Sequence, residues 1–257
     1  MNGPNPIRVA WSMLRNQLTV ARPRPAGTGR FDHSALSPPL EALARGKMAA
    51  LGGLRPALDH YIDGLAAVDP NELSSNEALA FWLNLYNAGA LRLAADAVTS
   101  GEESVLRVPG AFDGPFVAVA GEHLSLDAIE HAKIRRFGDP RIHSAIVCGS
   151  VSCPTLRGEP YDGDHLDRQL EDQMRHFLSS GGASASEGVL LLSRVFLWYG
   201  ADFVRPGRMP TWLPASPKRV AVALRPWLNE ETASVFTVTS PRIDFQPYDW
   251  GLRCAIG

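Results

Sequence analysis

Apolar residues recur at helical spacing along much of the chain, and shorter apolar runs between turn residues are typical of strands. Residues 36–68 are expected to form two helical pieces, broken around Gly52-Gly53 and Pro56. Similar spacing predicts further helices at 126–136 after a Ser125 cap, and at 163–179, 194–203 and 218–228. The apolar runs predict strands at 116–120, 123–124, 189–192, 235–238 and 243–245. The fold class is therefore α+β: a helix-rich single domain around a small, mainly antiparallel sheet.

A segment from Ser74 to about Val98 is apolar nearly all round, which predicts the buried central helix of the domain. Ser74 and Glu77 have the spacing of a capping box at its start. Asn84 and Asn87 lie three residues apart on one face of this helix. A buried amide without partners costs about 1–3 kcal/mol, so each must bond either a nearby loop or a ligand. Asn84 and Asn87 are therefore candidate substrate-binding residues.

Composition and charge exclude several classes of protein. The 257 residues are 45% hydrophobic and 20% charged, which excludes a wholly disordered chain, a collagen and a coiled coil. A net charge of −2 gives no reason to expect nucleic acid as a partner. No run of 18 apolar residues and no signal peptide is found, so we expect no membrane span and a cytoplasmic location. Three cysteines, an odd number, argue against a disulfide scaffold and for a reducing compartment.

The first part of the chain differs from the rest in charge. Residues 1–30 hold five arginines and no acid, and prolines and glycines are frequent among them. We therefore divide the chain into a basic, Pro/Arg-rich flexible extension at 1–29 and one domain at 30–257. An organelle transit peptide and a membrane-surface contact are the alternatives to a solvated tail for this extension.

Reactive side chains are dense in residues 122–157. A cysteine nucleophile needs a stabilised thiolate, and Cys153 precedes Pro154, a residue favoured at the first position of a helix. Cys153 is therefore the first candidate nucleophile, as the N-cap of a helix whose free N–H groups would stabilise the thiolate, and Cys148 is the second. His143 or His131 would act as the base. Glu130 would orient a histidine, and His143 rather than His131, because adjacent helical residues point about 100° apart.

Three other interpretations of this segment stay open. His131, His143, Cys148 and Cys153 could bind a structural zinc, although their separations by eleven, four and four residues match no common zinc pattern. Cys148 and Cys153 could form a reversible disulfide. Alternatively, the histidines are structural and Cys148 is a small apolar residue at the end of a strand. Ser150 and Arg157 complete the candidate substrate-binding residues, and the absence of dinucleotide, phosphate-loop and HExxH motifs gives no indication of a cofactor.

A set of ordered motifs together resembles the uncharacterised family DUF547, over roughly residues 31–252. They are Phe81-Trp82-Leu83-Asn84-Leu85-Tyr86-Asn87-Ala88, Leu124 to His131, Asp139-Pro140-Arg141-Ile142-His143, Cys148 to Pro154, and Trp198-Tyr199 with Asp202-Phe203, followed by Pro247-Tyr248-Asp249-Trp250. The resemblance implies no general activity. Bacterial members are often exported, some eukaryotic members carry a glutaredoxin-like domain, and plant members join a leucine zipper and often replace one or both cysteines.

The lead hypothesis is a cysteine-dependent hydrolase or acyl or thiol transferase that acts on an amide, a thioester or a thiol-containing small molecule or peptide. Because histidine precedes cysteine in the chain, such a site would be a permuted papain-like arrangement. The alternatives are a non-catalytic binding or scaffold domain, and a thiol-redox protein with a Cys148–Cys153 disulfide.

Overall fold

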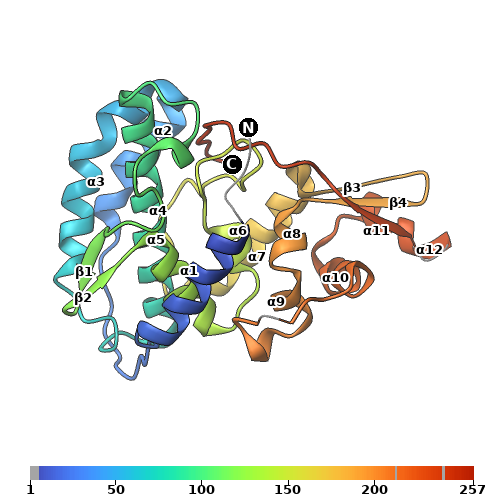
Figure 1. Ribbon diagram of the computed structural model, residues 1–257, viewed down its shortest axis with the longest axis horizontal. Helices are drawn as coiled ribbons and strands as arrows, with labels where there is room; N and C mark the ends of the chain where they lie inside the picture. Colours follow the sequence, from blue (N-terminus) through green and yellow to red (C-terminus); the bar gives the residue numbers. More distant parts are fainter. Residues whose placement is uncertain (1–5, 212, 239–240) are drawn as a thin grey trace.

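The structure is a computed structural model that describes residues 6–211, 213–238 and 241–257. Figure 1 shows two parts side by side, with helices between them. The first part holds α2 (Ser37–Gly46), α3 (Leu51–Ala66), α4 (Ser75–Thr99), β1 (Val117–Val119) and β2 (Glu122–Leu124). The second holds α8 (Val195–Trp198), α9 (Gly200–Val204), α10 (Pro217–Leu224), α11 (Glu230–Ala233), α12 (Val235–Val238), β3 (Ala183–Ser186), β4 (Val189–Leu192) and β5 (Arg242–Phe245). The helix-rich α+β class is confirmed.

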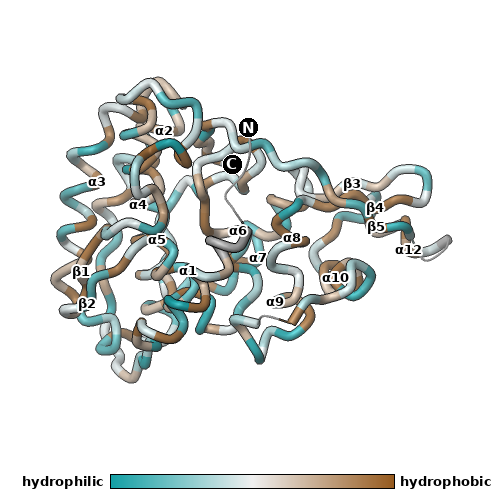
Figure 2. Tube along the Cα trace, viewed as in Figure 1, coloured by the Kyte–Doolittle hydropathy of each residue, from teal (hydrophilic) through white to brown (hydrophobic). Residues whose placement is uncertain are grey.

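Helix α4 is the buried centre of the first part, as its nearly continuous apolar pattern predicts. The Ser74 side chain accepts a hydrogen bond from the Glu77 N–H, so the predicted cap is confirmed. Apolar side chains of α2, α3 and α4 form one core with those of β1 and β2. A separate, smaller core lies between α10 and the sheet of the second part, and Figure 2 shows apolar residues along β1, β4 and α10.

The predicted break near Gly52-Gly53 is wrong, because α3 runs continuously from Leu51 through Pro56. The helical pieces separate earlier, where Lys47 follows α2 with a positive φ of 49°. A proline clashes with the carbonyl four residues before it. That residue is Gly52, near the start of α3, so the proline interrupts only the first turns of the helix.

Two small sheets replace the single sheet expected from the sequence. β1 and β2 pair antiparallel, β3 and β4 pair antiparallel, and β4 pairs with β5 in parallel. The strands at 189–192 and 243–245 are therefore confirmed. Residues 235–238 form the short helix α12, so the predicted strand there is wrong. Asn229 caps α11 just before it, and the chain continues as helix rather than extending.

Further helices lie in the middle of the view in Figure 1, and two of them belong to the reactive segment at residues 122–157. They are α1 (Pro6–Thr19), α5 (Leu126–Ala128), α6 (Ile142–Ala145) and α7 (Leu166–Phe177). Ser125 caps α5 as predicted. The chain then continues through a π-helical turn, η4 (Ile129–Lys133), and a 3₁₀ turn, η5 (Ile134–Phe137). Shorter turns complete the fold: η1 (Ser34–Leu36), η2 (Lys47–Ala50), η3 (Val105–Arg107), η6 (Leu178–Gly182), η7 (Pro206–Arg208) and η8 (Arg225–Trp227).

The segment that the sequence assigns to a flexible extension is bonded to the body at several points. Helix α1 lies against α5 and η4. The Lys133 ammonium and the Glu122 carboxylate hold the carbonyl and the N–H of Ala21. The backbone of Gly29 pairs with that of Leu73. None of the described helices has the length and apolar character that crossing a bilayer requires.

Candidate functional site

The two cysteines of the central loop lie together. The Sγ atoms of Cys148 and Cys153 are 2.8 Å apart, and the Cys148 N–H donates to the Cys153 sulfur at 2.9 Å. Two hydroxyl groups complete the surroundings of Cys148: Ser150 Oγ at 2.9 Å and Tyr248 Oη at 3.3 Å. Both thiols are free and partly exposed. The loop thus brings two sulfur atoms and two hydroxyl groups together, with both cysteines partly exposed.

The hydrogen bonds make the two thiols unequal. The Cys153 thiol, which donates to Cys148, lowers the pKa of Cys148 to about 7, and the Ser150 and Tyr248 hydroxyls contribute in the same direction. Burial raises the pKa of Cys153, and a thiolate at Cys148 raises it further. Cys148 is therefore the thiolate of the pair and Cys153 is its proton donor. This order is the reverse of the order expected from the sequence.

The predicted helix start at Cys153 is wrong. No helix follows Pro154; the chain stays extended, and Leu156 forms a bridge with Ile256. Helix N-terminal N–H groups therefore do not stabilise a thiolate at Cys153. The loop is instead held by a second long-range bridge, between Ser150 and Leu252, which brings the C-terminal segment and Tyr248 alongside the cysteines.

A buried charged cluster lies on the neighbouring helices. The Arg135 guanidinium donates to both carboxylate oxygens of Asp202 at 2.9 and 3.0 Å, and His143 Nε2 lies 2.9 Å from Asp202 Oδ2. All three side chains are at most 2% exposed. Burial raises the pKa of Asp202, but the hydrogen bond from His143 and the charge of Arg135 outweigh it and lower the pKa. Asp202, not Glu130, therefore contacts His143.

Glu130 and His131 occupy the π-helical turn η4. His131 Nδ1 lies 3.5 Å from Glu130 Oε1 and 3.5 Å from the Arg135 guanidinium. Burial, followed by the charge of Arg135, lowers the pKa of His131 to about 3, so this imidazole is neutral at pH 7. Glu130 therefore lies beside His131, the histidine that the sequence argument set aside in favour of His143.

Tyr86 of α4 lies between the charged cluster and the cysteines. Its hydroxyl donates to Glu130 Oε2 at 3.3 Å. Burial raises the pKa of Tyr86, and negative charge on Glu130 and then on Cys148 raises it further, so both regions act on one phenol. Two buried atoms in this region, Glu130 Oε1 and His143 Nδ1, have no hydrogen-bond partner. No hydrogen bond joins either cysteine to a histidine within the described part of the chain.

Both asparagines of α4 bond to loop backbone. Asn84 holds the N–H and the carbonyl of Tyr161 at 2.9 and 2.8 Å. Asn87 donates to the Ala145 carbonyl at 2.9 Å and accepts from the Val147 N–H at 3.0 Å. Of the two alternatives, the loop partner is therefore the one found. Asn87 fixes the backbone directly before Cys148, so its position bears on the geometry of the thiol.

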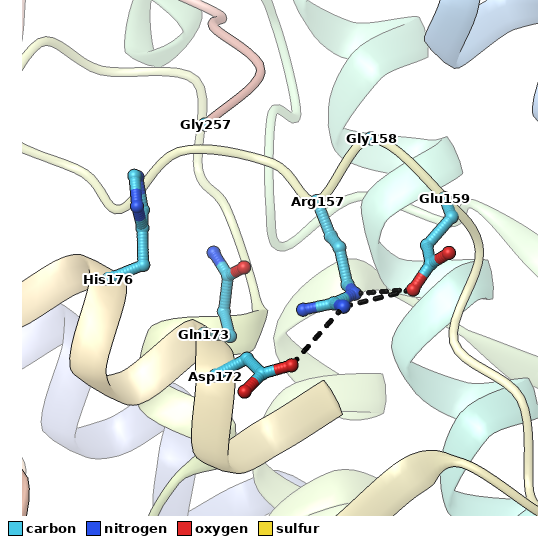
Figure 3. Close-up of a pocket in the computed structure, with 7 residues that line it drawn as sticks. All are labelled: Arg157, Gly158, Glu159, Asp172, Gln173, His176 and Gly257. Atoms are coloured by element: carbon cyan, nitrogen blue, oxygen red, sulfur yellow. Dashed lines mark hydrogen bonds and ion pairs between the residues drawn. The ribbon is translucent and has the colours of Figure 1, made fainter. Parts of the chain in front are cut away.

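Arg157, the remaining candidate, lies at a separate surface pocket. The pocket is lined by Arg157, Gly158, Glu159, Asp172, Gln173, His176 and Gly257 (Figure 3). Arg157 pairs with Glu159 at 2.9 Å and with Asp172 at 3.7 Å. Its charge is thus matched by two carboxylates, and no cysteine lines this pocket. Among the described residues, no group of three His, Cys, Asp or Glu side chains is arranged to hold a metal ion.

Sequence reasoning assigned no role to Asp202, Arg135, Tyr86 or Tyr248, which contact the candidate residues. Asp202 had a usable signal, because it is the only charge in the segment from Val195 to Val204. A charge in an apolar segment must find a partner when it is buried. Tyr248 gave no such signal, since its hydroxyl reaches the loop from a hundred residues away.

The comparisons with known proteins identify the central region. Residues 70–178 match the family described as "Protein of unknown function, DUF547", and this part of the chain is a DUF547 domain. The match includes α4, the charged residues of η4 and η5, His143 and both loop cysteines. Asp202 and Tyr248 lie outside it. No curated protein and no solved structure matches the chain.

Proposed function

We propose that this protein is a thiol-disulfide oxidoreductase whose reactive group is the Cys148–Cys153 pair. The observation that carries the proposal is the 2.8 Å separation of the two Sγ atoms, together with hydrogen bonds that lower the pKa of Cys148 alone. A disulfide needs sulfur atoms about 2.05 Å apart, so a small movement of the loop would close the bond. A thiol whose pKa lies near the ambient pH combines thiolate population with nucleophilicity.

The two thiols would act in sequence. The Cys148 thiolate attacks one sulfur of a substrate disulfide, forms a mixed disulfide and releases the other sulfur as a thiolate. Cys153 then loses its proton and attacks the Cys148 sulfur, which forms the Cys148–Cys153 disulfide and releases the second substrate thiol. The substrate gains two electrons and two protons overall. A dithiol reductant would return the pair to its reduced form.

An aromatic surface beside the pair gives a substrate apolar contact area. Tyr248, which bonds Cys148, packs on Trp198 and Trp250 with ring centroids 4.8 and 4.4 Å away. Trp198 is 44% exposed. A peptide or a small disulfide can therefore lie on aromatic rings while its sulfur reaches Cys148. Reversible dithiol chemistry fits the reducing compartment that the odd cysteine count predicts.

A cysteine-dependent hydrolase or transferase, with a permuted papain-like arrangement, is the second candidate. The lowered pKa of Cys148 favours it, since an acyl acceptor also needs a thiolate. Transfer to water requires a base, and the candidate is His143 Nδ1, a buried imidazole nitrogen without a hydrogen-bond partner. The two candidates differ in their need for Cys153, because only the redox reaction uses a second thiol.

The test counts thiols by peptide-resolved alkylation after equilibration in glutathione buffers of increasing oxidation. We expect Cys148 and Cys153 to disappear together as one disulfide while Cys254 stays reduced, since it is buried and its pKa is raised to about 12 by that burial. Cys153→Ala should trap a mixed disulfide with glutathione at Cys148. Cys148→Ala, the matched control, should trap none.

Two outcomes would decide against the redox proposal. Equal thiol counts for Cys148 and Cys153 in oxidising and reducing buffers would exclude the pair as a redox couple. Turnover of an activated thioester by Cys153→Ala at the rate of the parent protein, through an acyl group on Cys148, would favour the hydrolase or transferase instead.

A further inference from the structure

Helix α1 presents its apolar side chains to solvent and its small polar side chains to the body of the protein. Trp11, Leu14 and Leu18 are 66%, 39% and 75% exposed. Ser12 and Asn16 are buried. An amphipathic helix on a soluble domain normally has the opposite orientation, with its apolar stripe toward the core.

Specific bonds fix this orientation. Ser12 Oγ donates to Asp127 Oδ2 at 2.9 Å, and Asn16 extends the contact to Ser12. The Arg136 guanidinium donates to the Gln17 carbonyl at 3.2 Å, near the end of the helix. Figure 1 shows α1 alongside α5, the helix that carries Asp127. The polar face is therefore used internally, and the apolar face is left as an outer surface.

The outer surface is also basic. At 100° per residue, Trp11, Leu14, Arg15 and Leu18 fall within an arc of about 100°. Arg15, Arg22 and Arg24 are exposed, and no described carboxylate forms an ion pair with them. Residues 1–30 contain no Asp or Glu.

The pKa of Arg136, which bonds the end of α1, is affected by this positive charge. Burial lowers the pKa of Arg136, and the charge of Arg22 is the next cause in the same direction. The Arg22 and Arg136 guanidinium groups at the end of α1 are therefore close enough for their charges to act on each other.

We infer that α1 is a membrane-surface helix, which lies in the plane of an anionic bilayer and attaches the domain to it. Tryptophan and leucine side chains enter the boundary between headgroups and acyl chains, while arginines pair with anionic headgroups. Each basic residue near such a surface strengthens partition about fivefold. In a free amphipathic helix the polar face contacts water; here Ser12 and Asn16 contact the domain, so the helix and the domain would bind as one body.

Charge argues against a second copy of the chain as the occupant. In a symmetric pair of α1 helices the same patch faces itself, so a basic surface would face a second basic surface. No acid in residues 1–30 could separate these charges. An anionic lipid surface matches both the apolar stripe and its arginines.

The experiment is sedimentation of the full chain with sucrose-loaded vesicles of phosphatidylcholine, with and without about one third phosphatidylserine. We expect sedimentation with the anionic vesicles, little with the neutral ones, and weaker binding as salt screens the arginines. The double variant Trp11→Ser/Leu18→Ser should lose binding at least about tenfold. Arg15→Gln/Arg22→Gln should lose about 25-fold, at fivefold for each residue.

Val222→Ser is the control variant. It changes an apolar side chain of α10 that is 59% exposed, and it should bind the vesicles like the parent protein. All the changed side chains are exposed, so urea midpoints should agree among the variants. Failure of the parent chain to bind anionic vesicles would overturn the inference. So would unchanged binding by Trp11→Ser/Leu18→Ser, or a dimer in solution that this variant abolishes.

Discussion

The cysteine pair and the Arg135–Asp202–His143 cluster both draw on the reactive segment at residues 122–157, yet their surroundings differ. Cys148 and Cys153 are partly exposed, and the bonds between them involve sulfur and hydroxyl groups. Arg135 and Asp202 are buried and joined by two charge-assisted hydrogen bonds. Weak bonds at an accessible point allow a thiol to react, whereas paired charges in a dry interior hold elements together. The number of reactive residues in a segment therefore says little about which of them can meet a substrate.

The largest expected effect comes from breaking the buried cluster. Asp202→Ala would leave the Arg135 guanidinium buried without its carboxylate, and we expect about 3–5 kcal/mol less stability in urea unfolding. Asp167→Ala, the control, removes a carboxylate that also contacts an arginine but is 87% exposed, and it should leave the midpoint unchanged. Similar midpoints for the two variants would contradict the role of Asp202.

Acid should destabilise the folded protein through His131, which lies beside Arg135 of the cluster. The pKa of this imidazole is lowered from 6.5 to about 3, so between these values the unfolded chain binds a proton that the folded protein does not. Stability is therefore lost as pH falls below 6.5, by about 1.4 kcal/mol per pH unit for this one group. His131→Gln should flatten the pH dependence of the urea midpoint between pH 6.5 and the range where carboxylates titrate. Parallel profiles for the two proteins would exclude the effect.

Asn87 holds the backbone between His143 and Cys148, and Asn84 provides its matched control. Each alanine variant leaves two loop backbone groups without their amide, at a cost of about 1–3 kcal/mol. Only Asn87→Ala frees the backbone before Cys148, so only it should change the rate at which iodoacetamide labels Cys148. Equal labelling rates in both variants would show that the loop holds its geometry without Asn87.

The smallest effect is expected at Tyr248. Tyr248→Phe removes a hydroxyl that lowers the pKa of Cys148, but the larger contribution, from Cys153, remains. The labelling profile of Cys148 should move to higher pH, and by less than in Cys153→Ala. Stability should change by no more than about 1.5 kcal/mol, the net value of one hydrogen bond. A shift to lower pH would contradict the assigned hydrogen bond.

Local patterns in the sequence were enough for much of the fold. The Ser74 cap, the buried helix α4, the Ser125 cap and the strand β4 follow from apolar spacing and from side chains that bond their own backbone neighbours. The strand predicted at 235–238 was wrong because a short, mainly apolar run of four residues fits a short helix equally well. The helix predicted after Cys153 was wrong because long-range bridges hold that segment extended.

The sequence by itself determined the helix-rich α+β class, the central helix and the stretch that carries the cysteines, the histidines and Glu130. The tertiary structure decided which of these groups meet. Asp202 reaches His143 across 59 residues, and Tyr248 reaches Cys148 across 100. Tyr248 adds to the lowering of the Cys148 pKa, and Asp202 is the hydrogen-bond partner of the buried His143. Local patterns encode which backbone conformation a segment prefers, while the electrostatics of a site depend on side chains that only the folded chain brings into contact.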